Sequence, residues 1–137
     1  MASPRKINHI GIAVHDIEAA AKFYTENLGL SLGSIEEVVD QKVKVAFLPI
    51  GEVRLELLQP TSPESAVAKF LEKNGPGFHH VAYEVADVTA EVERLKAEGV
   101  KMVDEKPRKG AHDSLIAFIH PKASGGLLTE IVQPAHG

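Results

Sequence analysis

The sequence contains no cysteine, which excludes a disulfide scaffold, a thiolate-bound zinc site and a cysteine nucleophile. It is also short of cations: 15 basic against 19 acidic side chains leave a net charge of −4. A generic nucleic-acid binder needs clustered lysine and arginine. No apolar run approaches the roughly 18–20 residues of a membrane span, and none follows the N-terminus as a signal peptide would require. We therefore expect a cytoplasmic protein that binds neither nucleic acid nor membrane.

The chain does contain enough apolar residues for a core. It has 137 residues, 44% of them hydrophobic, and one domain typically takes roughly 100–200 residues. A chain of this size can fold without a disulfide or metal to hold it together. We therefore predict a single domain over residues 1–137.

The most informative feature is an internal duplication. Residues 7–14 recur as 78–85, with His80 at the place of His9, 71 residues further on. Residues 43–48 recur as 114–119 at the same offset, and 56–60 recur as 130–134. A repeated pattern of this kind indicates a repeated structural unit. We predict two repeats, 6–60 and 77–134, joined by a helical connection over 61–76.

Each repeat is predicted to contain a strand, a helix and three more strands. Alternation of apolar residues predicts the strands, and an Asp cap with a following Gly stop predicts each helix. The first repeat is predicted to have a helix over 17–28 and strands over 7–14, 31–39, 43–49 and 53–59. The connection is predicted to contain a helix over 62–73, with Pro63 at its first helical position. The second repeat is predicted to have a helix over 87–98 and strands over 79–85, 100–105, 114–119 and 127–133. A four-stranded half cannot bury both of its faces alone. We therefore predict an α+β fold of two tandem βαβββ modules around a common concavity.

Strand parity predicts which side chains share a face. A tight hairpin at residues 50–53 would set Phe47 opposite Glu56 and place both on one face. His9 would lie on a face whose other residues are small. Such a face leaves room for a cavity.

Two histidines and two glutamates at matched repeat positions indicate a divalent metal site. The duplication pairs His9 with His80 and Glu56 with Glu130. Of the adjacent histidines, register and repeat both select His80 over His79. Imidazole and carboxylate donors suit Co, Mn, Ni, Fe or Zn and leave positions for substrate. The alternative is that the repeat preserves these four residues for structural reasons alone.

Three motifs are more selective than the duplication. They are Glu-Leu-Leu-Gln-Pro at 56–60 followed by 65–71, Gly-Phe-His-His-Val-Ala-Tyr at 77–83, and Lys-Gly-Ala-His at 109–112 leading to 118–130. Together they resemble the methylmalonyl-CoA epimerase family of the vicinal oxygen chelate superfamily, over residues 6–134. Glyoxalase I, in the same superfamily, usually carries an Asp-Pro-Asp-Gly turn before its last strand, and residues 120–126 here read differently.

The resemblance implies a vicinal oxygen chelate (glyoxalase-like) fold around a metal-binding concavity. It implies one divalent metal ion (Co, Mn, Ni or Zn) held by His9, Glu56, His80 and Glu130. The implied reaction is epimerisation of (2R)/(2S)-methylmalonyl-CoA, by proton abstraction at C2 with a metal-stabilised enolate. Glu130 is the first candidate base and Glu56 its symmetric partner. The implied partners are an acyl-CoA substrate and a second copy of the chain in a homodimer.

The resemblance leaves the second proton-transfer base unassigned. Some members of the family place a Glu on the strand that here reads 43–47, where Val45 and Phe47 are predicted to face the cavity. Two other functions stay open: a glyoxalase I-like lyase acting on a hemithioacetal, and a non-catalytic small-molecule-binding protein of the same fold. Basic loop residues that could meet coenzyme A phosphates are Lys106, Arg108, Lys109 and Lys122.

Overall fold

The structure, a computed structural model, describes residues 3–135. Residues 9–79 form one compact unit, here the N-terminal unit, and residues 3–8 with 80–135 form the second, here the C-terminal unit. The single domain over 1–137 stays a prediction, and its residues 1–2 and 136–137 lie outside the described part. No helix in the described part is long and apolar enough to cross a lipid bilayer.

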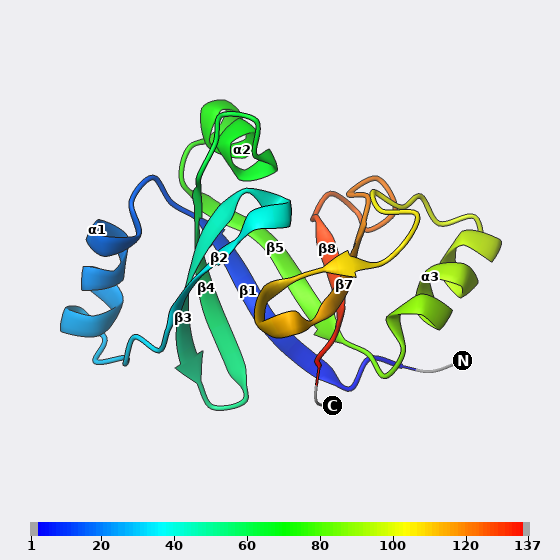
Figure 1. Ribbon diagram of the computed structural model, residues 1–137, viewed down its shortest axis with the longest axis horizontal. Helices are drawn as coiled ribbons and strands as arrows, with labels where there is room; N and C mark the ends of the chain where they lie inside the picture. The colour runs from blue at the N-terminus through cyan, green and yellow to red at the C-terminus, as the bar shows by residue number, and fades with distance from the viewer. Residues whose placement is uncertain (1–2, 136–137) are drawn as a thin grey trace. The chain divides into compact units, whose positions relative to one another are not determined.

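The N-terminal unit follows the predicted order of strand, helix and three strands (Figure 1). Its elements are β1 (Lys6–Ala13), α1 (Ile17–Lys22), the π-helical turn η1 (Phe23–Asn27), β2 (Ile35–Val38), the 3-10 turn η2 (Val39–Gln41), β3 (Val43–Ile50), β4 (Val53–Pro60) and α2 (Ala66–Asn74). Its strands lie in the order β2-β3-β4-β1. β1 is parallel to β4, and β3 and β4 form an antiparallel hairpin. The first residues of β1, before His9, belong to the C-terminal unit.

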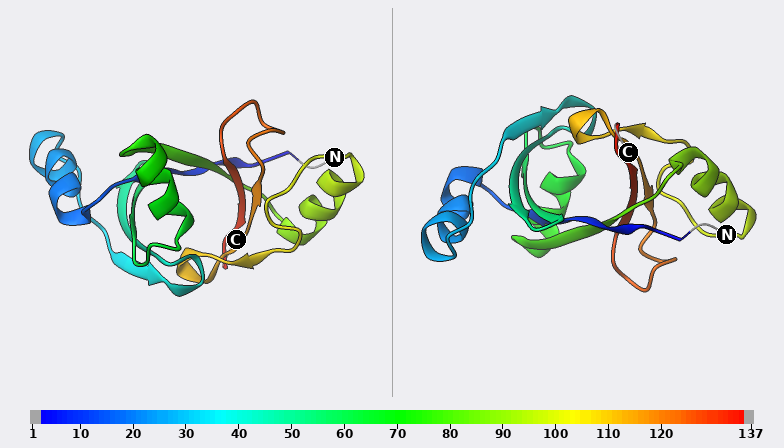
Figure 2. Two further views of the ribbon diagram at one scale, coloured as in Figure 1. Left: turned by 90° about the horizontal axis from the view of Figure 1, so that it is seen from above. Right: turned by 90° about the horizontal axis from the view of Figure 1, so that it is seen from below.

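Helix α1 is fixed at its start by two side-chain acceptors. The Asp16 carboxylate accepts the Glu18 N–H at 3.0 Å, as expected of an Asp at a helix N-cap. The Gln59 side-chain oxygen on β4 accepts the Ile17 N–H at 2.9 Å. The apolar side of α1 packs in one cluster with Leu48 and Leu57. In both views of Figure 2, α1 and α2 lie on opposite sides of β3 and β4.

The hairpin has the predicted register. Residues 50 and 53 pair at the turn, and Phe47 lies opposite Glu56. Because side chains alternate along a strand, Phe47 and Glu56 point to the face opposite Leu48 and Leu57. The acidic residue therefore lies on the face away from α1.

The C-terminal unit repeats this arrangement. Its elements are β5 (Gly77–Glu84), α3 (Val88–Ala97), β6 (Arg108–Lys109), the 3-10 turn η3 (Ala111–Asp113), β7 (Leu115–Ile119) and β8 (Thr129–Gln133). Its strands lie in the order β5-β8-β7-β6, with β5 parallel to β8. Gln133 accepts the Val88 N–H at 3.0 Å, as its repeat equivalent Gln59 accepts that of Ile17. The duplication therefore extends to the hydrogen bond that ties each helix to its last strand.

One predicted helix starts later than expected, and one predicted strand does not form. The connecting helix begins at Ala66 rather than 62, because Ser65 is its N-cap and accepts the Val67 N–H at 3.1 Å. Strand 100–105 does not form; only Met102 makes an isolated bridge, to Ile119.

The side chain of Asp104 explains the missing strand. Asp104 Oδ2 accepts the Phe118 N–H at 2.9 Å, a place that a strand's backbone carbonyl would fill in a regular ladder. The pairing partner of β7 on that side is the two-residue strand β6. The predicted strand 31–39 is formed only as β2, which covers four residues. The predicted helix 17–28 is formed as α1 followed directly by the π-helical turn η1.

We expect His120, in the C-terminal unit, to make the stability of the protein depend on pH. Burial, with the charges of Lys101 and Lys122, lowers the pKa of His120 from its usual 6.5. The folded chain therefore binds this proton less readily than the unfolded chain, so stability is lost as pH falls through about 6.5 towards the lower folded value. His120 Nδ1 also accepts the Lys122 N–H at 3.0 Å.

We expect His120→Asn to reduce the fall in Tm between about pH 7 and pH 5. Asparagine retains an acceptor for the Lys122 N–H but does not titrate. Thermal unfolding followed by circular dichroism at several pH values measures the slope of Tm against pH. A slope equal to that of the unsubstituted protein would contradict this assignment.

Candidate metal-binding and catalytic site

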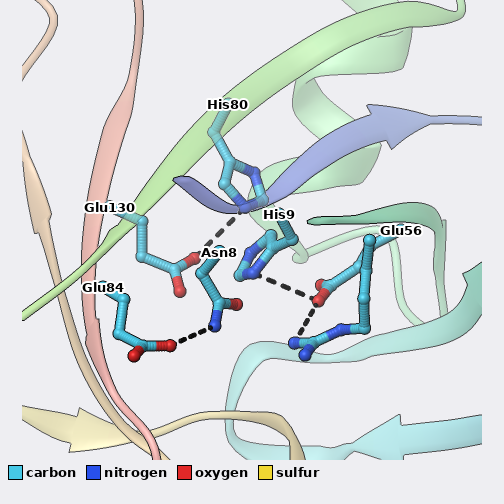
Figure 3. A network of polar contacts seen from close by, with 7 residues as sticks. Asn8, His9, Glu56, His80, Glu84 and Glu130 are labelled. Atoms are coloured by element: carbon cyan, nitrogen blue, oxygen red, sulfur yellow. Dashed lines mark hydrogen bonds and ion pairs between the residues drawn. The ribbon is translucent and has the colours of Figure 1, made fainter. Parts of the chain in front are cut away.

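The N-terminal unit brings together the first predicted donor pair. His9 Nδ1 lies 3.2 Å from Glu56 Oε2 (Figure 3), and the two residues are only 5% and 4% exposed. Their strands β1 and β4 are parallel neighbours, and Gly11 lies beside Glu56 in the register. Because Gly11 has no side chain, the Glu56 side chain has room to lie along β1 towards His9. The strand pairing thus turns a sequence pattern into a buried contact.

Arg54 is a third member of this cluster. It precedes Glu56 by two residues on β4, so both side chains share a face. Its Nη2 donates to Glu56 Oε2 at 3.0 Å, and its guanidinium lies 5.4 Å from the centroid of the Phe47 ring. The same carboxylate oxygen therefore has an imidazole and a guanidinium as neighbours.

The C-terminal unit brings together the second pair. His80 Nε2 lies 3.1 Å from Glu130 Oε1, as Figure 3 also shows, and each residue is 4% exposed. Ala82 lies beside Glu130 in the parallel pairing of β5 with β8, at the place that Gly11 takes beside Glu56. The His80 ring meets Phe118 edge to face at 5.4 Å. The two pairs are equivalent in register as well as in sequence.

The histidine next to His80 has a different environment. The His79 ring packs edge to face on Phe70 of α2, with centroids 5.0 Å apart, and is buried. This contact with a helix agrees with the strand parity. The assignment of His9, Glu56, His80 and Glu130 as the metal ligands stays a prediction.

The position expected for a second base is apolar. Val45 and Phe47 on β3 are 3% and 2% exposed, and Phe47 lies opposite Glu56 while Val45 lies opposite Leu58. Both side chains therefore point to the Glu56 face, as predicted. Neither can accept a proton, and the second base stays unassigned.

Two sets of polar contacts near the donors were not predicted from the sequence. The first is that of Arg54, whose parity on β4 places it on the face of Glu56 but does not by itself predict the contact between them. The other is in the C-terminal unit, where buried Asn8 donates to Glu84 Oε1 at 3.2 Å and Arg5 lies 3.4 Å from Glu84 Oε2. This contact links residues 76 positions apart, and no local pattern indicates it.

Of the four basic residues predicted to lie in loops, Arg108 and Lys109 form strand β6 instead. Arg108 differs from the three lysines in its contacts. Its Nε lies 3.2 Å from Asp104 Oδ1, and its guanidinium lies 5.7 Å from the centroid of the Phe118 ring. Arg108 is half-buried, whereas Lys106, Lys109 and Lys122 are exposed. The contact of any of them with coenzyme A stays a prediction.

The donor chemistry of both pairs fits a metal ion. Two atoms that bind the same ion, each at about 2.1 Å, lie on the order of 3 Å from each other. The two histidine–glutamate distances are 3.2 and 3.1 Å. Buried side chains with donor atoms for an ion include His9, His80 and Glu130. Imidazole nitrogen with carboxylate oxygen suits first-row divalent ions.

Comparison with known proteins extends the likeness to nearly the whole chain. Residues 8–118 match the Glyoxalase/Bleomycin resistance protein/Dioxygenase superfamily. The ethylmalonyl-CoA/methylmalonyl-CoA epimerase of Cereibacter sphaeroides is 41% identical, over 93% of this chain and 97% of that protein. The mitochondrial methylmalonyl-CoA epimerase of Homo sapiens is 38% identical, over 93% of this chain and 73% of that protein.

A solved structure agrees with these sequences. It is a methylmalonyl-CoA epimerase in complex with methylmalonyl-CoA and NH4+, 42% identical, with a TM-score of 0.93 over 97% of this chain and 96% of that chain. The predicted vicinal oxygen chelate fold is thereby confirmed. The chain belongs to the methylmalonyl-CoA epimerase family, within the glyoxalase/bleomycin resistance protein/dioxygenase superfamily.

Proposed function

We propose that this protein is a metal-dependent methylmalonyl-CoA epimerase, which interconverts the (2R) and (2S) forms of its substrate. The observation that carries the proposal is the pair of buried histidine–glutamate contacts at repeat-equivalent positions, His9 with Glu56 and His80 with Glu130. Relatives named as epimerases share about two-fifths of their residues with this chain over nearly its full length.

His9, Glu56, His80 and Glu130 would together hold one divalent metal ion. Such an ion would supply Lewis-acid stabilisation of the enolate that forms when C2 loses its proton. Neutral imidazoles and ionised carboxylates are the donor forms needed, so the four side chains supply two negative charges. Co, Mn, Ni and Zn all accept such donors.

Glu130 is the residue we assign to proton transfer. In this step the C2–H bond breaks, its electron pair passes into the enolate, and a carboxylate oxygen of Glu130 takes the proton. The contact of Glu130 Oε1 with His80 Nε2 fixes the orientation of the carboxylate. Glu56 is the symmetric candidate, but its Oε2 is already held by both His9 and Arg54.

Buried apolar side chains flank both pairs. Phe47 lies opposite Glu56 and Phe118 opposite Glu130 in their hairpins, and both rings are at most 6% exposed. Apolar walls exclude water, which strengthens the electrostatic interactions of the donors. They also suit the methyl substituent at C2 of the substrate.

Product analysis separates this function from the two alternatives. Purified, metal-loaded protein incubated with (2S)-methylmalonyl-CoA should give a mixture of the two diastereomers, resolved by chromatography. It should form no thioester from methylglyoxal and a thiol. The opposite result would indicate the glyoxalase I-like lyase, and no reaction of either kind with metal bound would indicate a non-catalytic binding protein.

The homodimer and the cytoplasmic location stay predictions. Sedimentation equilibrium of the purified chain measures the first, and a mass of twice 14.8 kDa is the expected result. The substrate range is also open. The Cereibacter sphaeroides relative carries both ethylmalonyl-CoA and methylmalonyl-CoA in its name, so both thioesters belong in the assay.

A further inference from the structure

Arg54 and Glu56 form an ion pair inside the candidate site. Arg54 Nη2 lies 3.0 Å from Glu56 Oε2, and the two side chains are 31% and 5% exposed. A carboxylate so deeply buried is costly without a compensating charge. The Arg54 guanidinium supplies the compensating charge, and it reaches the Glu56 carboxylate from a more exposed position on the same strand.

The register of the hairpin keeps the guanidinium in place. Arg54 lies over the Phe47 ring at 5.4 Å, and Phe47 is itself fixed opposite Glu56. A cation is attracted to the face of an aromatic ring, and the planar guanidinium suits such stacking better than an ammonium. Arg54 therefore contacts both Phe47 and Glu56.

This arginine is not part of the duplication. Leu128 stands two residues before Glu130, at the place of Arg54 before Glu56. The C-terminal unit also has an arginine over its equivalent ring, Phe118, but this residue is Arg108 of β6 and its ion pair is with Asp104. The two units therefore differ at one position: the residue two places before the donor glutamate is a cation in the N-terminal unit and apolar in the C-terminal unit.

The difference changes the net charge of the site. A divalent ion with two ionised carboxylates is neutral as a group, whereas the addition of the Arg54 cation leaves one positive charge. The substrate carries a free carboxylate and becomes more negative as the enolate forms. A site with one positive charge therefore attracts this substrate more strongly than a neutral one.

We propose that Arg54 is a positioning residue that offsets the charge of Glu56, so that the site binds the anionic carboxylate of the substrate. The proposal rests on the proposed function, whose metal site it assumes. Arg54 acts through Glu56 and not by touching the substrate.

A double-substitution cycle tests this role by binding, not by turnover. Arg54→Met removes the cation but keeps an apolar stem near Phe47, Glu56→Gln removes the anion, and the double variant restores the balance. Calorimetry with Co²⁺ alone measures ion affinity, and titration of the Co²⁺-loaded proteins with methylmalonyl-CoA and with propionyl-CoA isolates the contribution of the carboxylate.

We expect Arg54→Met to weaken methylmalonyl-CoA binding about tenfold relative to propionyl-CoA binding, because one unit charge near a partly buried site is worth about one decade in affinity. For the same reason, the Arg54→Met variant should bind Co²⁺ more tightly than the unsubstituted protein does. The double variant should return to within about threefold of the unsubstituted ratio. Arg54→Lys, which keeps the charge, should also retain most of the ratio.

A double variant that binds methylmalonyl-CoA as weakly as Arg54→Met would overturn the proposal, because the arginine would then contact the substrate directly. Failure of the unsubstituted protein to bind Co²⁺ would overturn it as well. A protein that binds Co²⁺ and shows the expected cycle but does not interconvert the diastereomers would support the role of Arg54 and reject the proposed function. The two failures are therefore distinguishable.

Discussion

Glu130→Gln should abolish hydrogen exchange at C2 of methylmalonyl-CoA while leaving the protein folded. Glutamine has nearly the same shape as glutamate, but its amide cannot take up the C2 proton. Loss of a positioned general base costs typically about 10²–10⁴-fold in rate. Because Glu130 is buried beside His80, the amide can still contact the imidazole, so we expect little change in Tm.

The exchange rate is measured by proton NMR in deuterated water, with the ion content of each sample determined by elemental analysis. Glu56→Gln is the matched control, since it makes the same chemical change at the equivalent position of the other repeat. It should retain more exchange than Glu130→Gln. Unaltered exchange in Glu130→Gln with metal still bound would reject Glu130 as the base.

His80→Ala and His9→Ala should each weaken divalent metal binding by at least about 100-fold. Residues that only orient a ligand already change affinity about 10–100-fold, and removal of a donor removes a bond to the ion itself. Both imidazoles are buried beside a carboxylate. Calorimetric titration with Co²⁺ or Zn²⁺ measures the affinity directly.

His79→Ala is the control for these substitutions. This residue is adjacent to His80 and also buried, but its ring packs on Phe70. We expect its loss to lower Tm, since an aromatic pair is worth about 0.5–1.5 kcal/mol beyond its buried area, and to leave metal affinity within a few-fold. Loss of metal binding in His79→Ala, with His80→Ala unaffected, would show that the ligand of the pair had been chosen wrongly.

The parts of the fold that the sequence predicts well are those fixed by alternation and repetition. The pairing of Phe47 with Glu56 follows from one tight turn, and its equivalent, Phe118 with Glu130, follows from the duplication. Each His–Glu contact joins neighbouring parallel strands. The sequence indicates this contact because both residues recur together.

The predicted elements differ from the structure where a side chain takes the place of a backbone group in a hydrogen bond. Residues 100–105 have the apolar content of a strand, but Asp104 accepts the Phe118 N–H itself. Ser62 accepts the Glu64 N–H at 3.1 Å, so Pro63 lies in a turn and the helix starts only after Ser65. Such local competition between side chain and backbone leaves no periodic signal.

The sequence predicts the metal donors and the reaction of the candidate site. It does not predict the positive charge of Arg54 beside Glu56. Arg54 has the parity of Glu56, and only the folded hairpin shows that its guanidinium lies on both the carboxylate and the Phe47 ring. Long side chains with several rotamers reach partners that strand parity alone does not identify. The charge balance of the site is therefore a property of the structure.

We propose that these residues, when they hold a divalent metal ion, would activate the C2 proton. The measurement that tests it most directly is proton NMR of metal-reconstituted protein with (2R)- or (2S)-methylmalonyl-CoA in deuterated water, beside an EDTA-treated sample. We predict that deuterium enters at C2 only in the sample that contains metal. Equal exchange in the EDTA-treated sample, or no exchange with Co, Mn, Ni or Zn bound, would contradict the claim.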